Sequence, residues 1–231
     1  LKEANIPDSV EEVGSYAYYG CTAITSAVLG HKLASVGEYI FGRCTSLETV
    51  TFRTDEDIIC DWMFYGCSSL KTIVDFPESA KTIGKHAFEG CAEITSITIP
   101  NTITKIDNYA FADCVGLTSI SLPKALEVIG EYAFYGCSRL TSVHIPNSII
   151  KIREYAFYDS GLTNIEMPNN VTEIATYAFC STNIVNLIIP DSVTTIGEKA
   201  FSDCTSLTSV TIGNSITSIG ERAFQHCTKL T

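Results

Sequence analysis

Ten cysteines and four histidines are the side chains of this 231-residue chain that could carry covalent or metal chemistry. Thiolates form disulfides, bind zinc or act as nucleophiles, and imidazoles bind metals or transfer protons. Eight of the cysteines share one spacing, three residues after an aromatic residue in segments such as "AFYGC": Cys21, Cys44, Cys67, Cys91, Cys114, Cys137, Cys204 and Cys227. Any chemistry therefore depends on the elements that place these residues so regularly.

The cysteine spacing belongs to a repeat of 22–24 residues. A second marker, the first apolar residue of segments such as "LTSV", keeps the same register as the aromatic one. The aromatic markers are Tyr18, Phe41, Phe64, Phe88, Phe111, Phe134, Phe157, Phe179, Phe201 and Phe224. A fixed period of this length is typical of proteins in which each repeat packs against its neighbours.

Each repeat contains one clear strand signal. Segments such as "ITSITIP" have apolar residues at positions one, four and six, which predicts a short strand with one buried face. Proline ends this strand in seven repeats because it has no N–H to donate. A polar turn and a second apolar pair follow. The "EYAFYGC" segment, too short for a longer helix, is predicted to form one or two helical turns.

These elements predict a repeat solenoid of the α/β class that is rich in β structure. A parallel sheet would form one face, with short strands and brief helical turns on the other. Because about ten repeats run without a linker, residues 1–231 are expected to form a single domain. The absence of atypical capping repeats suggests a fragment of a longer protein.

Two repeats, "ITSITIPNTITKIDNYAFADC" (94–114) and "LTSVTIGNSITSIGERAFQHC" (207–227), resemble the BspA-like leucine-rich repeats of bacteria. The resemblance extends over the whole chain. It implies a right-handed leucine-rich-repeat horseshoe or arc. It also implies a cell-surface or secreted location and adhesion to host proteins or other cells.

The repeat argues against reactive cysteines. Stacked repeats would place successive thiols about 5 Å apart but pointing the same way, which is poor geometry for a disulfide, whereas small buried residues suit a core column. No close ligand pairs occur that would bind zinc. Cys60 and Cys180 lie outside the column, and either could be more exposed. With the histidines scattered and no catalytic motif present, we predict neither an enzyme nor a cofactor or metal site.

Composition limits the partners. The net charge of −11 and the pI near 4.7 disfavour nucleic acid and anionic membranes, which require a basic surface. No apolar run is long enough to span a bilayer, so no direct membrane insertion is expected.

One patch interrupts the outward face of the predicted strands, which otherwise carries mostly Ser and Thr. There polar, charged and apolar residues meet, as a recognition site requires, although sequence drift could produce the same mixture. These candidate ligand-binding residues are His144, Asn164, Glu166, Val185, Asn186 and Ile188.

A second column, two residues before the aromatic marker, is rich in tyrosine. Its clearest members are Tyr109, Tyr132, Tyr155 and Tyr177. Stacked rings would stabilise one another, and exposed ring edges would form an adhesive stripe for protein or glycan.

The sequence thus predicts a non-catalytic protein-binding or adhesion module of a cell-surface or secreted protein. Its partner would be a host, neighbouring-cell or matrix protein. The alternative is a structural stalk or spacer that presents another domain.

Overall fold

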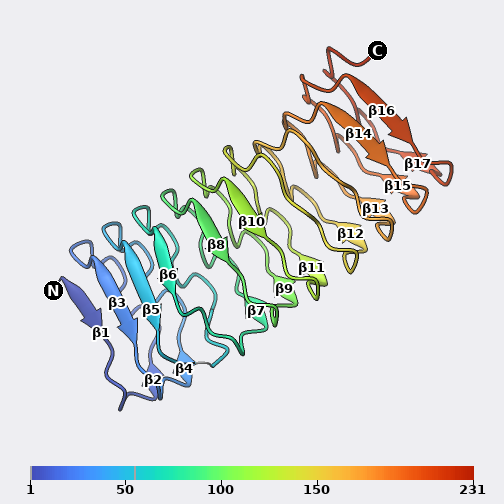
Figure 1. Cartoon of the computed structure of the whole chain (residues 1–231). Coiled ribbons are helices and arrows are strands. Elements are labelled where there is room, and N and C mark those ends of the chain that lie inside the picture. Colours follow the sequence, from blue (N-terminus) through green and yellow to red (C-terminus); the bar gives the residue numbers. More distant parts are fainter. Residues whose placement is uncertain (1, 55) are drawn as a thin grey trace.

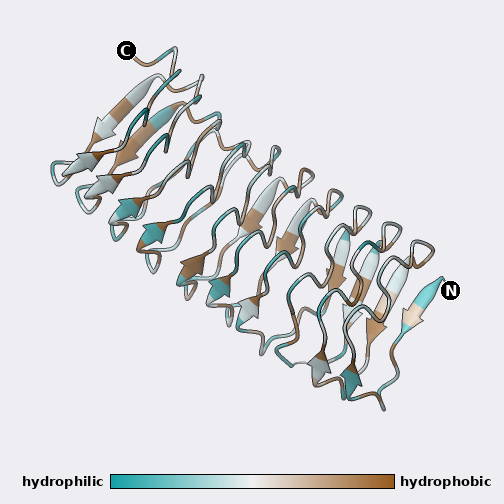
Figure 2. Cartoon of the chain, turned by 180° about the vertical axis from the view of Figure 1, so that it is seen from behind, coloured by the Kyte–Doolittle hydropathy of each residue, from teal (hydrophilic) through white to brown (hydrophobic). Residues whose placement is uncertain are grey.

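The computed structural model describes residues 2–54 and 56–231. Its coils stack in one continuous row with the two chain ends at opposite ends of the row (Figure 1). Each regular coil passes through a strand of a front ladder, turns, and passes through a shorter strand of a back ladder. The predicted solenoid of parallel strands is confirmed. Seen from behind, single strands carry both hydrophobic and hydrophilic residues, as one-sided burial requires (Figure 2).

The described residues contain seventeen short strands. The front ladder comprises β1 (Glu3–Asn5), β3 (Ser26–Leu29), β5 (Thr49–Phe52), β6 (Thr72–Val74), β8 (Ser96–Thr98), β10 (Ser119–Ser121), β14 (Asn186–Ile189) and β16 (Ser209–Ile212). The back ladder comprises β2 (Glu12–Val13), β4 (Ser35–Val36), β7 (Thr82–Ile83), β9 (Lys105–Ile106), β11 (Val128–Ile129), β12 (Lys151–Ile152), β13 (Glu173–Ile174), β15 (Thr195–Ile196) and β17 (Ser218–Ile219).

Strand pairing joins equivalent residues of neighbouring repeats. Ser26 pairs with Thr49 in the front ladder, and Lys151 pairs with Glu173 in the back ladder. Because side chains alternate across a strand, each repeat position becomes a column that is either buried or exposed along its length.

The aromatic markers form one unbroken column of stacked rings. From Tyr18 to Phe224, successive ring centroids lie 5.3–5.9 Å apart. The rings from Phe41 to Phe201 are fully buried. Each of these rings packs against its equivalents in the coils on both sides, which no isolated coil could supply.

The cysteine column has a hydrogen-bonding role. In seven coils the thiol donates to the carbonyl oxygen of the aromatic marker in the preceding coil, with Sγ–O distances of 3.0–3.3 Å. All ten cysteines are free. Cys180 lies outside the cysteine column and is only 2% exposed. The prediction that it could be more exposed than the column is therefore wrong for this residue. Cys60 is partly buried, and burial raises the pKa of its thiol to about 12.

The column changes at Ser160 and Thr182, where the repeat is one residue shorter before the next strand. Ser160 is buried, and its hydroxyl has no hydrogen-bond partner among the residues that the structure describes. Thr182 donates instead to the carbonyl of Phe179 in its own coil, at 2.9 Å. A buried hydroxyl without a partner costs about 1–3 kcal/mol, which makes the coil of Ser160 a weak point of the core.

The predicted helical turns are wrong, since residues 2–54 and 56–231 contain no helix. In the "EYAFYGC" segment, alternate N–H groups donate to the next coil: Tyr132 to Glu154, Phe134 to Ala156 and Gly136 to Tyr158. These donors are therefore unavailable for the bonds within a coil that a helix needs. In addition, each residue of the tyrosine column has a left-handed backbone, with φ between 50° and 62°.

Replacing Phe134 by Ala is expected to lower the free energy of unfolding by about 3–5 kcal/mol, because it leaves a cavity between two coils. Chemical denaturation monitored by circular dichroism would measure the loss. The exposed Ser121→Ala variant is the control and should change stability by less than about 0.5 kcal/mol. A similarly small change for Phe134→Ala would contradict the central role of the ring column.

Ser160→Cys is expected to raise the free energy of unfolding by about 0.5–1.5 kcal/mol, because the longer thiol can donate to the carbonyl of Phe134 as in the other coils. Ser160→Ala should give a smaller gain, since it only removes the unpaired hydroxyl. The same denaturation measurement compares the two variants. A cysteine variant less stable than the alanine variant would contradict the proposed hydrogen bond.

Candidate functional site

The front ladder is interrupted where the sequence predicts the recognition patch. Strand β10 ends one ladder segment and β14 begins the next. In the two coils between them, a single parallel bridge between His144 and Glu166 remains. These two coils are the repeats that have 22 residues instead of 23. The shorter repeat length and the loss of the regular front strand therefore occur in the same coils.

Two shallow hollows flank Glu166 on this face. His144, Asn164 and Glu166 help to line the first, together with Ser121 and Ser142 of neighbouring coils.

Asn164 and Glu166 also line the second hollow, together with Asn186, Ile188 and Met167. The structure thus brings five of the six predicted residues together around two adjoining depressions.

The apolar members of the patch are exposed. Ile188 is 67% exposed, and Val185, which lies at the edge of the patch, is 39% exposed. Asn186 is held in place, because its Oδ1 accepts hydrogen bonds from Ser209 (2.7 Å) and Thr208 (3.3 Å). Glu166 forms no ion pair with any described residue, so its carboxylate can interact with a partner.

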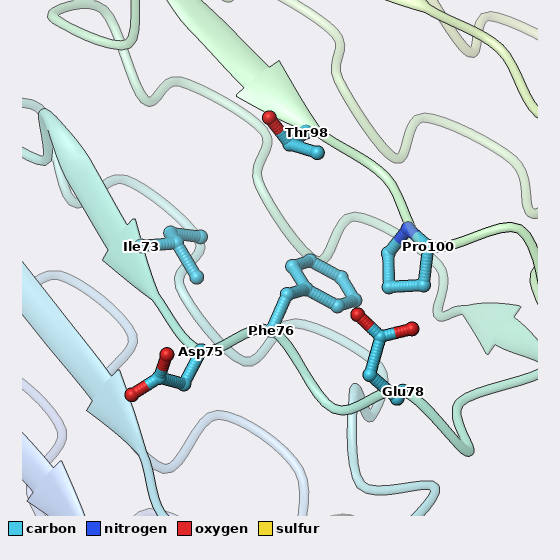
Figure 3. Close-up of a pocket in the computed structure, with 6 residues that line it drawn as sticks. All are labelled: Ile73, Asp75, Phe76, Glu78, Thr98 and Pro100. Carbon is cyan, nitrogen blue, oxygen red and sulfur yellow. The ribbon is translucent and has the colours of Figure 1, made fainter.

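The front ladder is also interrupted between β6 and β8, and another hollow lies there. This hollow was not predicted from the sequence. Figure 3 shows the carboxylates of Asp75 and Glu78 beside Phe76, across from Thr98. Asp75 is the extra residue of the only 24-residue repeat and has a φ of 54°. That extra residue was the sequence signal for an irregular surface at this position.

The tyrosine column forms a continuous stack, here called the aromatic ridge. The predicted members are stacked with centroid distances of 4.4 Å for Tyr109–Tyr132, 4.4 Å for Tyr132–Tyr155 and 4.7 Å for Tyr155–Tyr177. The complete aromatic ridge comprises Tyr16, Tyr39, Trp62, His86, Tyr109, Tyr132, Tyr155 and Tyr177.

Most rings of the aromatic ridge are half-buried, and Tyr16 is exposed. Stacked neighbours cover the ring faces, which leaves ring edges and hydroxyls for contact with solvent. Burial raises the pKa of Tyr132 to about 12, assisted by the neighbouring Tyr109 and Tyr155. The phenol of Tyr132 is therefore neutral at physiological pH and can donate a hydrogen bond.

One cluster of Ser, Asp and His side chains forms among the described residues. Asp203 accepts hydrogen bonds from Ser202 Oγ (2.6 Å) and His226 Nδ1 (2.9 Å), and these bonds lower the pKa of Asp203. A catalytic triad requires the serine to face the imidazole, whereas Ser202 donates to the carboxylate. Within residues 2–54 and 56–231, no three His, Cys, Asp or Glu side chains are placed to hold a metal ion.

The same part of the chain contains no helix that is long and apolar enough to span a bilayer.

Comparisons with known proteins agree with the repeat pattern. The model of the BspA type leucine rich repeat region matches in six copies over residues 1–118 and 104–231. A leucine-rich repeat protein from Bacteroides ovatus is similar in structure, with 30% identity and a TM-score of 0.82 over 99% of this chain and 73% of that protein. No curated protein matches the chain.

Two further structures are similar. A leucine rich cell surface protein from Faecalibacterium prausnitzii has 28% identity and a TM-score of 0.58, over 100% of this chain and 78% of its own. A leucine-rich repeat protein from Eubacterium ventriosum has 18% identity and a TM-score of 0.60, over 100% and 65%, which supports the fold alone. None of these matches indicates an enzyme family. Since the two matched ranges together cover all 231 residues, the chain belongs to the BspA-type leucine-rich repeat family.

Proposed function

We propose that the chain is a non-catalytic protein-binding module of a cell-surface or secreted protein, and that it mediates adhesion to a host or neighbouring-cell protein. The observation that carries this proposal is the exposed Ile188 beside the unpaired carboxylate of Glu166, on a face that carries mostly Ser and Thr. An apolar group ringed by polar ones is the usual arrangement of a protein interface.

The relatives support the proposed location. The similar protein from Faecalibacterium prausnitzii is described as a cell surface protein. A solenoid also suits recognition, because its stacked coils present an extended, rigid surface. Two adjoining hollows around Glu166 could accept side chains of a partner.

The double variant Glu166→Lys, Ile188→Asp should weaken binding to a partner protein by at least tenfold. It reverses the exposed charge and removes the apolar anchor, and interface anchors of this kind commonly dominate affinity. Binding of the purified chain to a panel of extracellular-matrix and plasma glycoproteins, measured by surface plasmon resonance, would test this expectation.

Glu3→Lys, Val28→Asp is the matched control, since it makes the same charge changes on the same face in the first two coils. It should bind as the unchanged chain does, and thermal unfolding should show that both variants are folded. Equal loss in both variants, or binding that survives in the first, would contradict the assigned patch. Failure to bind any protein would favour a structural spacer instead.

A further inference from the structure

The aromatic ridge is bordered by carboxylates on both sides. One row immediately precedes the ring residues and includes Glu38, Glu131 and Glu154. Burial is the main cause that raises the pKa of Tyr155, followed by the neighbouring Tyr177 and then by the charge of Glu154. The carboxylate of Glu154 therefore lies close to the rings.

A second acidic row follows the rings. It includes Glu89, Asp113 and Asp159. Burial, and then the charges of Glu89 and Asp159, raise the pKa of Asp113. Glu89 already contacts His86 Nδ1, whereas Asp113 and Asp159 form no ion pair with any described residue and are the carboxylates of this row that a positively charged partner would meet.

Two cationic side chains of the protein already contact this surface. Lys199 Nζ lies 5.0 Å from the ring centroid of Tyr177 and donates a hydrogen bond to its hydroxyl. The guanidinium of Arg43 lies 5.9 Å from the ring centroid of Tyr65, which borders the aromatic ridge. Tyr177 is the last ring of the stack, so one of its faces is open to Lys199, whereas the inner rings offer their edges and hydroxyl oxygens.

The spacing of the rings restricts the conformation of the partner. Two steps of the aromatic ridge, from Tyr132 to Tyr177, span about 9 Å. A polyproline II helix repeats every three residues at about 3.1 Å per residue, which is also about 9 Å. A basic residue at every third position would therefore meet every second ring, and aromatic surfaces are known to bind this conformation.

We propose that the aromatic ridge binds an extended, arginine-containing segment of a partner protein in the polyproline II conformation. Its arginines donate hydrogen bonds to the hydroxyl oxygens of alternate rings, as Lys199 does to Tyr177, and pair with the flanking carboxylates. This inference rests on the protein-binding role proposed above, but assigns binding to a second surface, separate from the patch around Glu166.

The test uses the whole chain and a fluorescent (Arg-Pro-Pro)5 peptide, with affinity measured by anisotropy. A peptide of the same composition with its arginines in one block should bind at least fivefold more weakly, because it cannot match the ring spacing. Trp62, the only tryptophan, lies within the aromatic ridge, so its emission should change when the repeating peptide binds. Equal affinity for the two peptides would overturn the proposal.

Glu131→Gln, Glu154→Gln should weaken binding of the repeating peptide at least tenfold. Glu78→Gln, Glu127→Gln removes the same charge from exposed residues elsewhere and should change affinity less than twofold. Equal loss in both variants would show binding by net charge alone and overturn the proposal. Tyr135→Ser, Tyr158→Ser should also weaken binding, since these rings border the aromatic ridge.

The Glu166→Lys, Ile188→Asp variant separates the two proposals. It should bind the repeating peptide with unchanged affinity. Loss of peptide binding in this variant would place the peptide on the front face and overturn the assignment to the aromatic ridge. Peptide binding that persists while the glycoprotein panel remains negative would support the aromatic ridge and contradict only the front-face patch.

Discussion

The core rings from Phe41 to Phe201 pack against their own equivalents one repeat away, and the rest of the structure depends on this constraint. Parallel pairing fixes the separation of neighbouring coils at about 4.8 Å, so a residue type persists in a column only if it tolerates a copy of itself on both sides. Phenylalanine satisfies this by stacking, with centroids 5.3–5.9 Å apart. Cysteine satisfies it because its thiol fits beside the ring column and donates to the carbonyl of the ring residue one coil back, which also accepts a backbone N–H within its own coil.

The aromatic ridge depends on the same constraint. A left-handed backbone at a residue other than glycine costs about 1–2 kcal/mol, yet the tyrosine column adopts it in each coil. Stacking between neighbouring rings contributes about 0.5–1.5 kcal/mol per pair, and the N–H groups released from local bonding pair with the next coil. The unfavourable backbone of one coil is thus offset by contacts that exist only in the array.

The repeat made the architecture predictable, because a marker such as Phe134 recurs in step with strand and turn signals. The predicted helical turn failed for a physical reason. Glu, Tyr, Ala and Phe occur readily in helices, and nothing in these residue types reveals that Tyr132 has a positive φ. The patch around Glu166 was visible as a break in the serine and threonine columns. The interruption of the front ladder at the same place could not be predicted, since strand pairing depends on how the shortened repeats pack against their neighbours.

Three irregularities coincide around the coil of Ser160: an unpaired buried hydroxyl, a front ladder reduced to one bridge, and a gap in the back ladder between β11 and β12. In a stacked array each coil is held only by its neighbours, so such a coil sets the mechanical strength of the whole row. Under a pulling force along the row, it would separate first and leave two shorter blocks folded. A partner bound across this coil would then be released in a defined step while the remaining coils stay folded.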